Sequence, residues 1–336
     1  MPMHRCIPLA SPAEWREALN GIRHAFAHTW ESCYAMHLTT GFPTYLYCFE
    51  DGETRIVCPL SERQYEGHVD IVTPYGFSGF IGNSDCPAFP REWTRFARER
   101  GYVCGYIQLN PLLENHTYFS SNELHRYHSL YVLDLTRSID EITARLDRGR
   151  RKQIQAIANG PAHLVFDCQA LRRFFLEQTA AFFHRKNAAR LYQFSEDTLS
   201  FLASAENVAL VGAGAPEQVE AVALTAYTPY IGEAFLQISR PGGERYAAEL
   251  VWERLKFLKS RQIPWMNLGG GVTEHDGVAA FKARFGTTRL ALGCLKQVYN
   301  PSAYALLCRQ AGREPTDLSG YFPPYHDPRA RESAHV

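Results

Sequence analysis

Apolar residues spaced three and four positions apart predict a helix near the start of the chain. Ser11 and Glu14 have the spacing of a capping box, with Pro12 in the first turn, where proline is well tolerated. The apolar positions that follow at helical spacing are Trp15, Ala18, Leu19, Ile22 and Phe26. We therefore expect one amphipathic helix that starts at this box and carries these five residues.

Strand patterns dominate the rest of the first half. Residues 44–49 and 54–60 flank Asp51-Gly52, a dipeptide that favours a tight hairpin turn. Other segments of this half predict strands over 70–73, 103–109 and 129–135, and a helix over 90–100. The first half is therefore expected to be mixed α and β.

A second series of elements begins at Ser138, which forms another capping box with Glu141. The helix that it opens has an apolar face, interrupted at Gly149, made of Ile139, Ile142, Leu146, Ile154 and Ile157. Further helices are predicted over 171–184 and 247–260. The predicted strands are 163–166, 208–212, 219–227, 234–239, 265–268 and 288–298.

The length and the order of the elements predict two domains. The chain has 336 residues, and domains average about 150 residues. Both halves follow the order helix, strands, helix, strands. We predict an α/β (α+β) fold with one domain over residues 1–136 and a second over 137–294, because the new series starts at the second capping box.

Composition excludes several classes of protein. The chain is 46% hydrophobic and 21% charged, which is typical of a folded protein rather than a disordered one. Lysine plus arginine number 35 and aspartate plus glutamate 35, which excludes a wholly basic nucleic-acid coat but not a local basic patch. No apolar run reaches the length of about 18 residues that a membrane helix needs. The nine cysteines form no C-x-x-C pair, so we expect no metal site and a soluble, cytoplasmic protein with reduced thiols.

Three glycines and a lysine form the first candidate site. Gly269 and Gly270, followed by Gly271, end a predicted strand and let the backbone approach a ligand closely. Lys282 lies between Phe281 and Phe285, which are four residues apart on one helix face. An isolated lysine on a helix is usually solvated, but we expect the two rings to clamp Lys282 beside the glycines. There its charge would face a developing oxyanion or a phosphate.

The turn from Arg240 to Tyr246 joins a predicted strand to a helix. Backbone N–H groups at such a helix start can bind a phosphate. Gly242 and Gly243 would permit the approach, and Arg240 and Arg245 would add charge. An ordinary Pro-Gly turn has the same sequence pattern, so both interpretations stay open.

A basic run surrounds residue 150. Its members are Arg145, Arg148, Arg150, Arg151 and Lys152, opposed only by Asp147. We expect Arg150, Arg151 and Lys152 to contact phosphates, either of RNA or of a phosphorylated acceptor. A solvated helix face is the alternative.

Ordered motifs across nearly the whole chain resemble those of the Fem-type (FemABX-like) aminoacyltransferases, a branch of the GNAT superfamily of acyltransferases. The motifs are Pro59-Leu60, Pro74–Gly79, Gln108–Pro111, Arg150-Arg151-Lys152, the phenylalanine-rich helix that runs into Tyr192-Gln193-Phe194, Asn267–Gly271 and Phe281–Gly286. The resemblance implies two GNAT-like domains, with the tail 295–336 packing back on the first. It also implies transfer of an amino acid from tRNA to an amine, with Lys282 near the reacting ester.

On this interpretation the chain forms an amide bond by direct attack of an amine on an activated acyl group. Aminoacyl-tRNA, contacted through its acceptor stem, or acyl-CoA would be the co-substrate, with no further cofactor. His275, Asp276 or a group of the substrate would be the general base. The acceptor, an amine-bearing peptide or small molecule, would lie near Tyr75, Ser78 and Asn110.

Two alternatives accompany this expectation. An acyl-CoA-dependent N-acyltransferase would use the turn at 240–246 for pyrophosphate, although Arg245 stands where the GNAT loop has a small residue. A binding module without catalytic activity could keep the same scaffold, because a fold does not determine a function.

Overall fold

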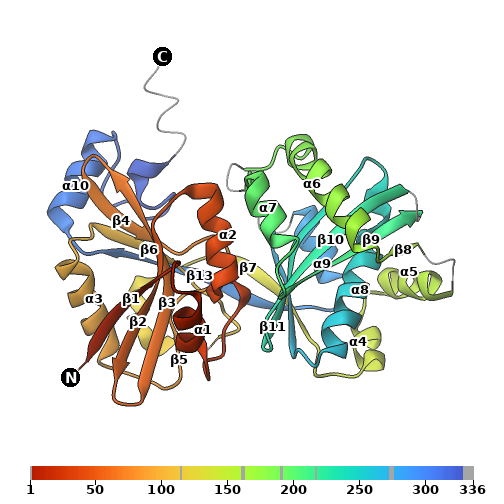
Figure 1. The fold of residues 1–336 in the computed structure, drawn as a ribbon, viewed down its shortest axis with the longest axis horizontal. Helices are drawn as coiled ribbons and strands as arrows, with labels where there is room; N and C mark the ends of the chain where they lie inside the picture. The colour runs from red at the N-terminus through yellow and green to blue at the C-terminus, as the bar shows by residue number, and fades with distance from the viewer. Residues whose placement is uncertain are drawn as a thin grey trace.

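The computed structural model describes residues 2–113, 116–159, 163–189, 192–215, 218–271 and 276–327. Two lobes lie side by side (Figure 1). The start of the chain and its C-terminal segment build the first lobe, and the middle of the chain builds the second.

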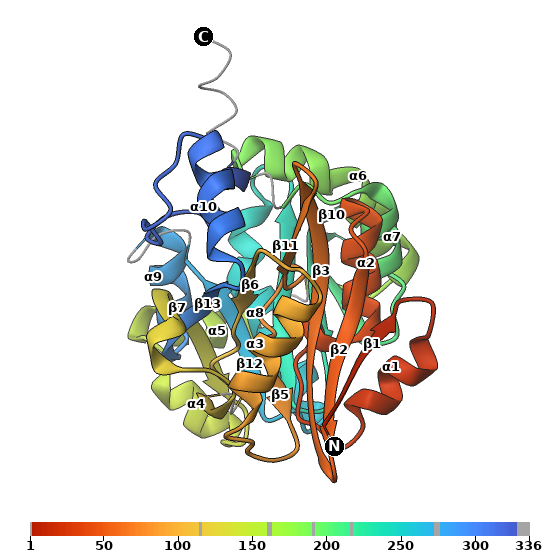
Figure 2. The ribbon, with the colours of Figure 1, turned by 90° about the vertical axis from the view of Figure 1, so that its left-hand side faces the viewer.

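The first lobe is a sheet with helices on both faces. Its strands are β1 (Met3–Pro8), β2 (Thr44–Asp51), β3 (Thr54–Tyr65), β4 (His68–Val72), β5 (Ile81–Gly82) and β6 (Cys104–Gln108). Its helices are α1 (Pro12–Leu19), α2 (Trp30–Thr40), α3 (Phe89–Glu99) and α10 (Pro301–Gln310). In Figure 2, α3 and α10 lie on the side toward the viewer. On the other face, Trp15 of α1 and Cys33 of α2 pack against Leu46 and Val57 of the sheet.

The second lobe repeats this layout. Its strands are β8 (Leu164–Val165), β9 (Val208–Ala215), β10 (Gln218–Tyr227), β11 (Ile231–Ser239) and β12 (Trp265–Gly270). Its helices are α4 (Ile139–Arg145), α5 (Arg148–Asn159), α6 (Cys168–Arg185), α7 (Glu196–Leu202), α8 (Ala247–Ser260) and α9 (Gly277–Ala283).

Two long strands join the lobes into one continuous sheet. They are β7 (Leu124–Asp134) and β13 (Thr288–Val298), which pair with each other along most of their length. β13 also pairs with β6 of the first lobe, and β7 also pairs with β12 of the second. The strand order is β1-β2-β3-β4-β6-β13-β7-β12-β11-β10-β9-β8. The mixed α/β fold with mostly antiparallel strands is as predicted, but the strands form one continuous sheet where one sheet per domain was expected.

Hydrogen bonds outside the sheet also hold the lobes together. Thr198 at the start of α7 donates to the carbonyl of Ala35 in α2 over 2.6 Å. The N–H of Ser195 donates to the Thr39 hydroxyl over 2.9 Å. Thr228, after β10, donates to the carbonyl of His24 over 2.8 Å. The contact therefore combines paired strands with packed helices.

Several predicted elements have different limits in the structure. The first helix ends at Leu19, because Gly21 adopts a positive φ of 76°, so Ile22 and Phe26 lie beyond it. The Ser11 side chain makes no capping hydrogen bond. Strand β1 and helix α2 were not predicted. The Ser138 capping box is confirmed, with both reciprocal hydrogen bonds present, but the helix that follows breaks at Leu146 rather than at Gly149.

The C-terminal segment is fastened to the first lobe by a buried carboxylate. Asp70 on β4 is 1% exposed. It accepts hydrogen bonds from Arg63 Nε over 2.7 Å, from His326 Nε2 over 2.8 Å and from the Tyr325 hydroxyl over 3.2 Å. Arg63 is also buried, so Asp70 compensates a charge that water does not reach.

Replacing Asp70 should therefore destabilise the protein strongly. We expect Asp70→Asn to lower the free energy of unfolding by about 3 kcal/mol, because Arg63 would be left buried without its counter-charge. Chemical denaturation followed by circular dichroism measures the change. Asp85→Asn, at an exposed position, is the control and should change the free energy little. Equal stabilities of the two variants would contradict this role of Asp70.

Candidate functional site

Strands β11 and β12 run parallel and then separate. Their backbones pair at three positions only, Ile231 with Trp265, Gly232 with Met266 and Glu233 with Asn267. Directly after these pairs, β11 shifts register against β10, and β12 shifts register against β7. A β-bulge bends its strand and increases its twist. Two bulges at the same level therefore move the strands apart beyond Glu233 and Asn267.

Lys282 lies at the end of β12, as the sequence predicted. Its ammonium donates a hydrogen bond to the carbonyl of Gly270 over 2.6 Å, and the side chain is only partly exposed. Burial lowers the pKa of Lys282 to about 8, with repulsion from Arg254 acting in the same direction and Asp276 opposing it. A cation is thus held beside the glycine turn with a proton that leaves near neutral pH.

The glycine turn is built to admit this ammonium. Gly269 has a positive φ of 77°, and a Cβ at that position would lie 3.2 Å from Lys282 Nζ. The N–H of Gly269 donates to Asn267 Oδ1 over 2.7 Å. This N–H is therefore occupied within the turn, whereas the ammonium of Lys282 presents a charge beside it.

The two phenylalanines do not clamp Lys282, and that expectation is wrong. Phe281 and Phe285 instead stack on Arg150, whose guanidinium carbon lies 4.6 and 4.4 Å from the two ring centres. Arg150 is 3% exposed. The two rings contact each other edge to face, with their centres 5.4 Å apart, so Arg150, more than 130 positions earlier in the chain, lies against both rings rather than between them.

The three basic residues at 150–152 do not form one exposed stripe. Arg150 is buried against the two rings, where an RNA phosphate would not reach it. Arg151 donates to the carbonyls of Thr143 over 3.1 Å and Leu146 over 3.2 Å, which end helix α4. Lys152 is exposed. Of these three residues, Lys152 is the one placed to meet a large anionic partner.

In the turn after β11, a carboxylate of the chain itself occupies the expected phosphate position. The N–H of Gly242 donates to Glu244 Oε2 over 2.8 Å, and the N–H of Gly243 donates to the Arg240 carbonyl over 3.0 Å. A hydrogen bond from its own N–H lowers the pKa of Glu244, and Lys186 acts in the same direction.

The two arginines of this turn also have partners within the chain. Arg245 pairs with Glu220 at 2.8 Å and lies over the Tyr246 ring. Arg240 lies over the Phe174 ring, 5.3 Å from its centre. Together with Glu244, these contacts leave the turn internally satisfied rather than open to a pyrophosphate.

The predicted acceptor residues lie on the first lobe, and Tyr75 faces the second. The Tyr75 ring contacts Tyr192, Phe194 and Phe235 edge to face. Asn110 is fully buried and holds the turn, because its side chain donates to the Phe77 carbonyl over 3.1 Å. Ser78 is also buried, and its hydroxyl has no hydrogen-bond partner among the described residues.

Of the two candidate bases, Asp276 lies within the described residues and His275 does not. Asp276 caps helix α9, since its side chain accepts from the N–H of Ala279 over 2.7 Å, and it lies near enough to Lys282 to raise its pKa. His275 lies outside the described residues.

Comparisons with known proteins identify the fold. No family model matches the sequence, and no curated protein matches it. Among solved structures, FemX superposes with a TM-score of 0.67 at 11% identity, over 91% of this chain and 99% of FemX. The chain has the Fem-type fold. A protein of unknown function from Bacteroides thetaiotaomicron superposes with a TM-score of 0.60 at 10% identity, over 89% of this chain and 100% of its own. L-PGS from Bacillus licheniformis does so with a TM-score of 0.54 at 14% identity, over 90% and 97%.

Two buried charged residues of this Fem-type fold were not singled out by the sequence analysis. Glu233 on β11 is 4% exposed and Arg254 on α8 is 2% exposed. Glu233 interrupts the apolar run of a strand, and Arg254 stands at a helical position whose neighbours Leu250, Leu255 and Leu258 are all buried. A charged residue at a position where the pattern expects an apolar one could have indicated both residues from the sequence.

Glu233 points from β11 toward the first lobe. It accepts a hydrogen bond from the backbone N–H of Phe26, while its Oε1 has no partner among the described residues. Burial raises the pKa of Glu233 to about 8. The carboxyl group is therefore largely protonated at neutral pH and can donate as well as accept.

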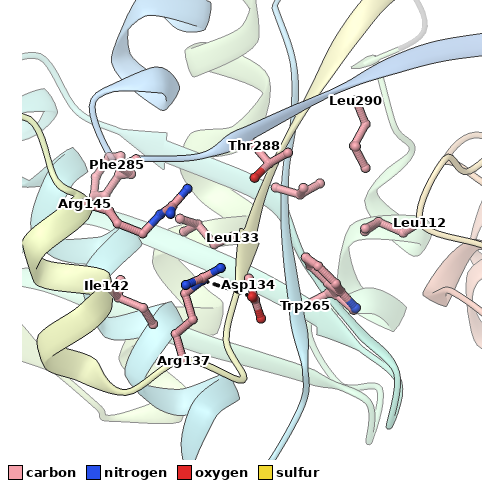
Figure 3. A pocket seen from close by; sticks show the side chains of 12 residues that line it. Leu112, Leu133, Asp134, Arg137, Ile142, Arg145, Trp265, Phe285, Thr288 and Leu290 are labelled. Carbon is pink, nitrogen blue, oxygen red and sulfur yellow. Dashed lines mark ion pairs between the residues drawn. The ribbon is translucent and has the colours of Figure 1, made fainter.

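A pocket of about 200 Å³ lies at the other end of β12 (Figure 3). Its walls include Trp265, Leu112 and Leu290, with Arg145 and an ion pair between Arg137 and Asp134 at 3.1 Å. Phe285, three residues after Lys282, also lines the pocket, but Lys282 and the glycines of the turn are not among its lining residues.

Two negative findings concern the described part of the chain. It contains no helix apolar and long enough to cross a membrane. It also contains no group of three or more histidine, cysteine, aspartate or glutamate side chains arranged to hold a metal ion.

The raised pKa of Glu233 predicts how stability depends on pH. Below about pH 4.5 the carboxyl is protonated in both the folded and the unfolded state. As pH rises toward about 8, only the unfolded state releases the proton, so the folded state loses stability.

Glu233→Gln should remove this loss. We compare the melting temperature of the variant with that of the natural protein at each pH. The variant should gain a few degrees more over the natural protein at pH 8 than at pH 5. Thermal scans at the two pH values measure it, with Glu196→Gln on the exposed start of α7 as the control. A difference that does not change with pH would show that Glu233 is ionised in the fold.

Proposed function

We propose that this protein is an acyltransferase that moves an aminoacyl group from aminoacyl-tRNA to an amine. The acceptor would be a peptide, a peptidoglycan precursor or a natural product. The observation that carries the proposal is the ammonium of Lys282, held 2.6 Å from the Gly270 carbonyl where two strands of a Fem-type fold separate.

The chemistry needs little more than positioning and one stabilising charge. The amine attacks the ester carbon, the carbonyl oxygen becomes an oxyanion, and the ribose oxygen leaves as the amide forms. Lys282 would stabilise the oxyanion, and its partial burial strengthens that interaction by excluding water. Because an aminoacyl ester is already activated, no covalent enzyme intermediate and no cofactor beyond the donor are required.

Asp276 is the proposed proton acceptor. It is near enough to Lys282 to favour the charged ammonium, and it is fixed at the start of α9 by the capping bond to Ala279. A carboxylate in this place can take a proton from the attacking amine, directly or through water. The acceptor itself would enter along the face that carries Tyr75, since Ser78 is buried beneath it.

The turn at residues 240–246 favours tRNA over acyl-CoA as the donor. Pyrophosphate would have to displace the Glu244 carboxylate from the N–H of Gly242. Like charges repel, so this turn disfavours the phosphate contact that an acyl-CoA enzyme of this fold would need.

Exposed Arg148 and Lys152 at the start of α5 offer contacts to the acceptor stem instead. A few such contacts are compatible with the zero net charge of the chain. A tRNA donor would place the reaction in the cytoplasm.

Lys282→Ala should lower turnover about a hundredfold and leave the fold intact, because one lost oxyanion donor has an effect of this size. Lys282→Arg should recover little activity, since a planar guanidinium does not fit the place of an ammonium beside Gly269. Single-turnover transfer from charged tRNA measures the rate, and circular dichroism checks the fold. Unchanged turnover in Lys282→Ala would refute the role of this residue.

Transfer from a charged tRNA pool should vanish after RNase treatment and weaken steeply as salt rises. Replacing Arg148 and Lys152 with glutamine should raise KM for tRNA and flatten the salt dependence, because fewer phosphates are neutralised. Replacing Lys256 on the exposed face of α8 is the matched control.

Two results would redirect the proposal. Product formed from acyl-CoA alone, insensitive to RNase, would identify an acyl-CoA-dependent N-acyltransferase. Failure to transfer from any donor, together with binding of a ligand, would identify a binding module on the same scaffold.

A further inference from the structure

Arg254 and Lys282 bind backbone carbonyls at the same level of the two separating strands. Lys282 donates to Gly270, three residues beyond Asn267, the last position of β12 that pairs with β11. Arg254 donates to Leu236, three residues beyond Glu233, the last position of β11 that pairs with β12. One cation is therefore fixed to each strand, at the level where the strands have parted.

Arg254 is buried without a counter-charge. It is 2% exposed, and no carboxylate lies within ion-pair distance of it among the residues that the structure describes. Its Nε has no hydrogen-bond partner there. An isolated buried charge is costly, and this guanidinium has one donor that no group of the described chain uses.

Arg254 acts electrostatically on Lys282. Burial lowers the pKa of Arg254 to about 9, and Arg254 in turn contributes to lowering the pKa of Lys282. Asp276 is the carboxylate that opposes this effect at Lys282. Two cations near one carboxylate leave an excess of positive charge between the strands, and an oxyanion would reduce the repulsion between them.

We propose that Arg254 and Lys282 together bind one small oxyanion between the separated ends of β11 and β12. In the proposed acyl transfer, on which this assignment of the natural ligand rests, that group is the oxyanion formed when the amine attacks the ester. Arg254 would then contact the reacting oxygen from the α8 side, opposite Lys282. Binding of the anion itself depends only on the two cations and does not require the proposed donor.

Sulfate is a suitable probe, because it is a tetrahedral oxyanion that stays doubly charged throughout the neutral pH range. Its binding to the full-length protein is measured by isothermal titration calorimetry at constant ionic strength with chloride as the balancing anion. Arg254→Gln and Lys282→Met should each weaken binding about tenfold or more, since each removes a charged hydrogen bond. Lys256→Gln removes one positive charge from the exposed face of the same helix and should leave binding unchanged.

The outcomes separate the possibilities. Binding to Arg254→Gln as tight as to the natural protein, or no sulfate binding by the natural protein, would overturn the proposal. Equal weakening in Lys256→Gln would also overturn it, because the effect would then be one of net charge.

If Arg254→Gln does not fold, sulfate binding by Arg254→Lys and by Lys282→Met tests the proposal instead. Retained binding in Arg254→Lys with loss in Lys282→Met supports the two-cation site, and normal binding in Lys282→Met contradicts it. Intact sulfate binding without transfer from aminoacyl-tRNA would refute the proposed donor and leave the anion site standing.

Discussion

Backbone pairing between β11 and β12 stops after Glu233 and Asn267, because each strand inserts one extra residue at that level. The rest of the site depends on this loss of pairing. Gly270 and Leu236 can offer their carbonyls to Lys282 and Arg254 only beyond the last paired residues. A single local irregularity, repeated in two neighbouring strands, thus creates a place for polar chemistry inside an otherwise apolar sheet.

The buried polar groups beside this separation oppose stability. Glu233 and Arg254 each carry a polar atom without a partner among the described residues, and such atoms reduce the free energy of folding. The surrounding structure tolerates them because aromatic cores lie on both lobes, and a network around Asp70 fastens the C-terminal segment. Uncompensated polar groups at one place in a well-packed protein are a common property of functional sites.

Short-range patterns made part of this structure predictable. The Ser138 capping box and the closeness of Lys282 to the glycine turn depend on residues near one another in sequence. The partner of Phe281 and Phe285 was not predictable in this way, since Arg150 comes from a helix more than 130 residues earlier. Helix α2 was missed because buried residues such as Ser32 and Ala35 give no clear apolar stripe. The occupation of the turn at 240–246 by Glu244 depends on how the loop folds back on itself, which periodicity does not describe.

The pairing of β7 with β13 has a mechanical consequence. Each of these strands forms one ladder with the other and a second ladder with a different lobe. Rotating one lobe against the other would break backbone hydrogen bonds in the middle of the sheet, so the molecule has no hinge at its midline. The distance between Tyr75 on one lobe and Lys282 on the other is thus a fixed dimension of the scaffold.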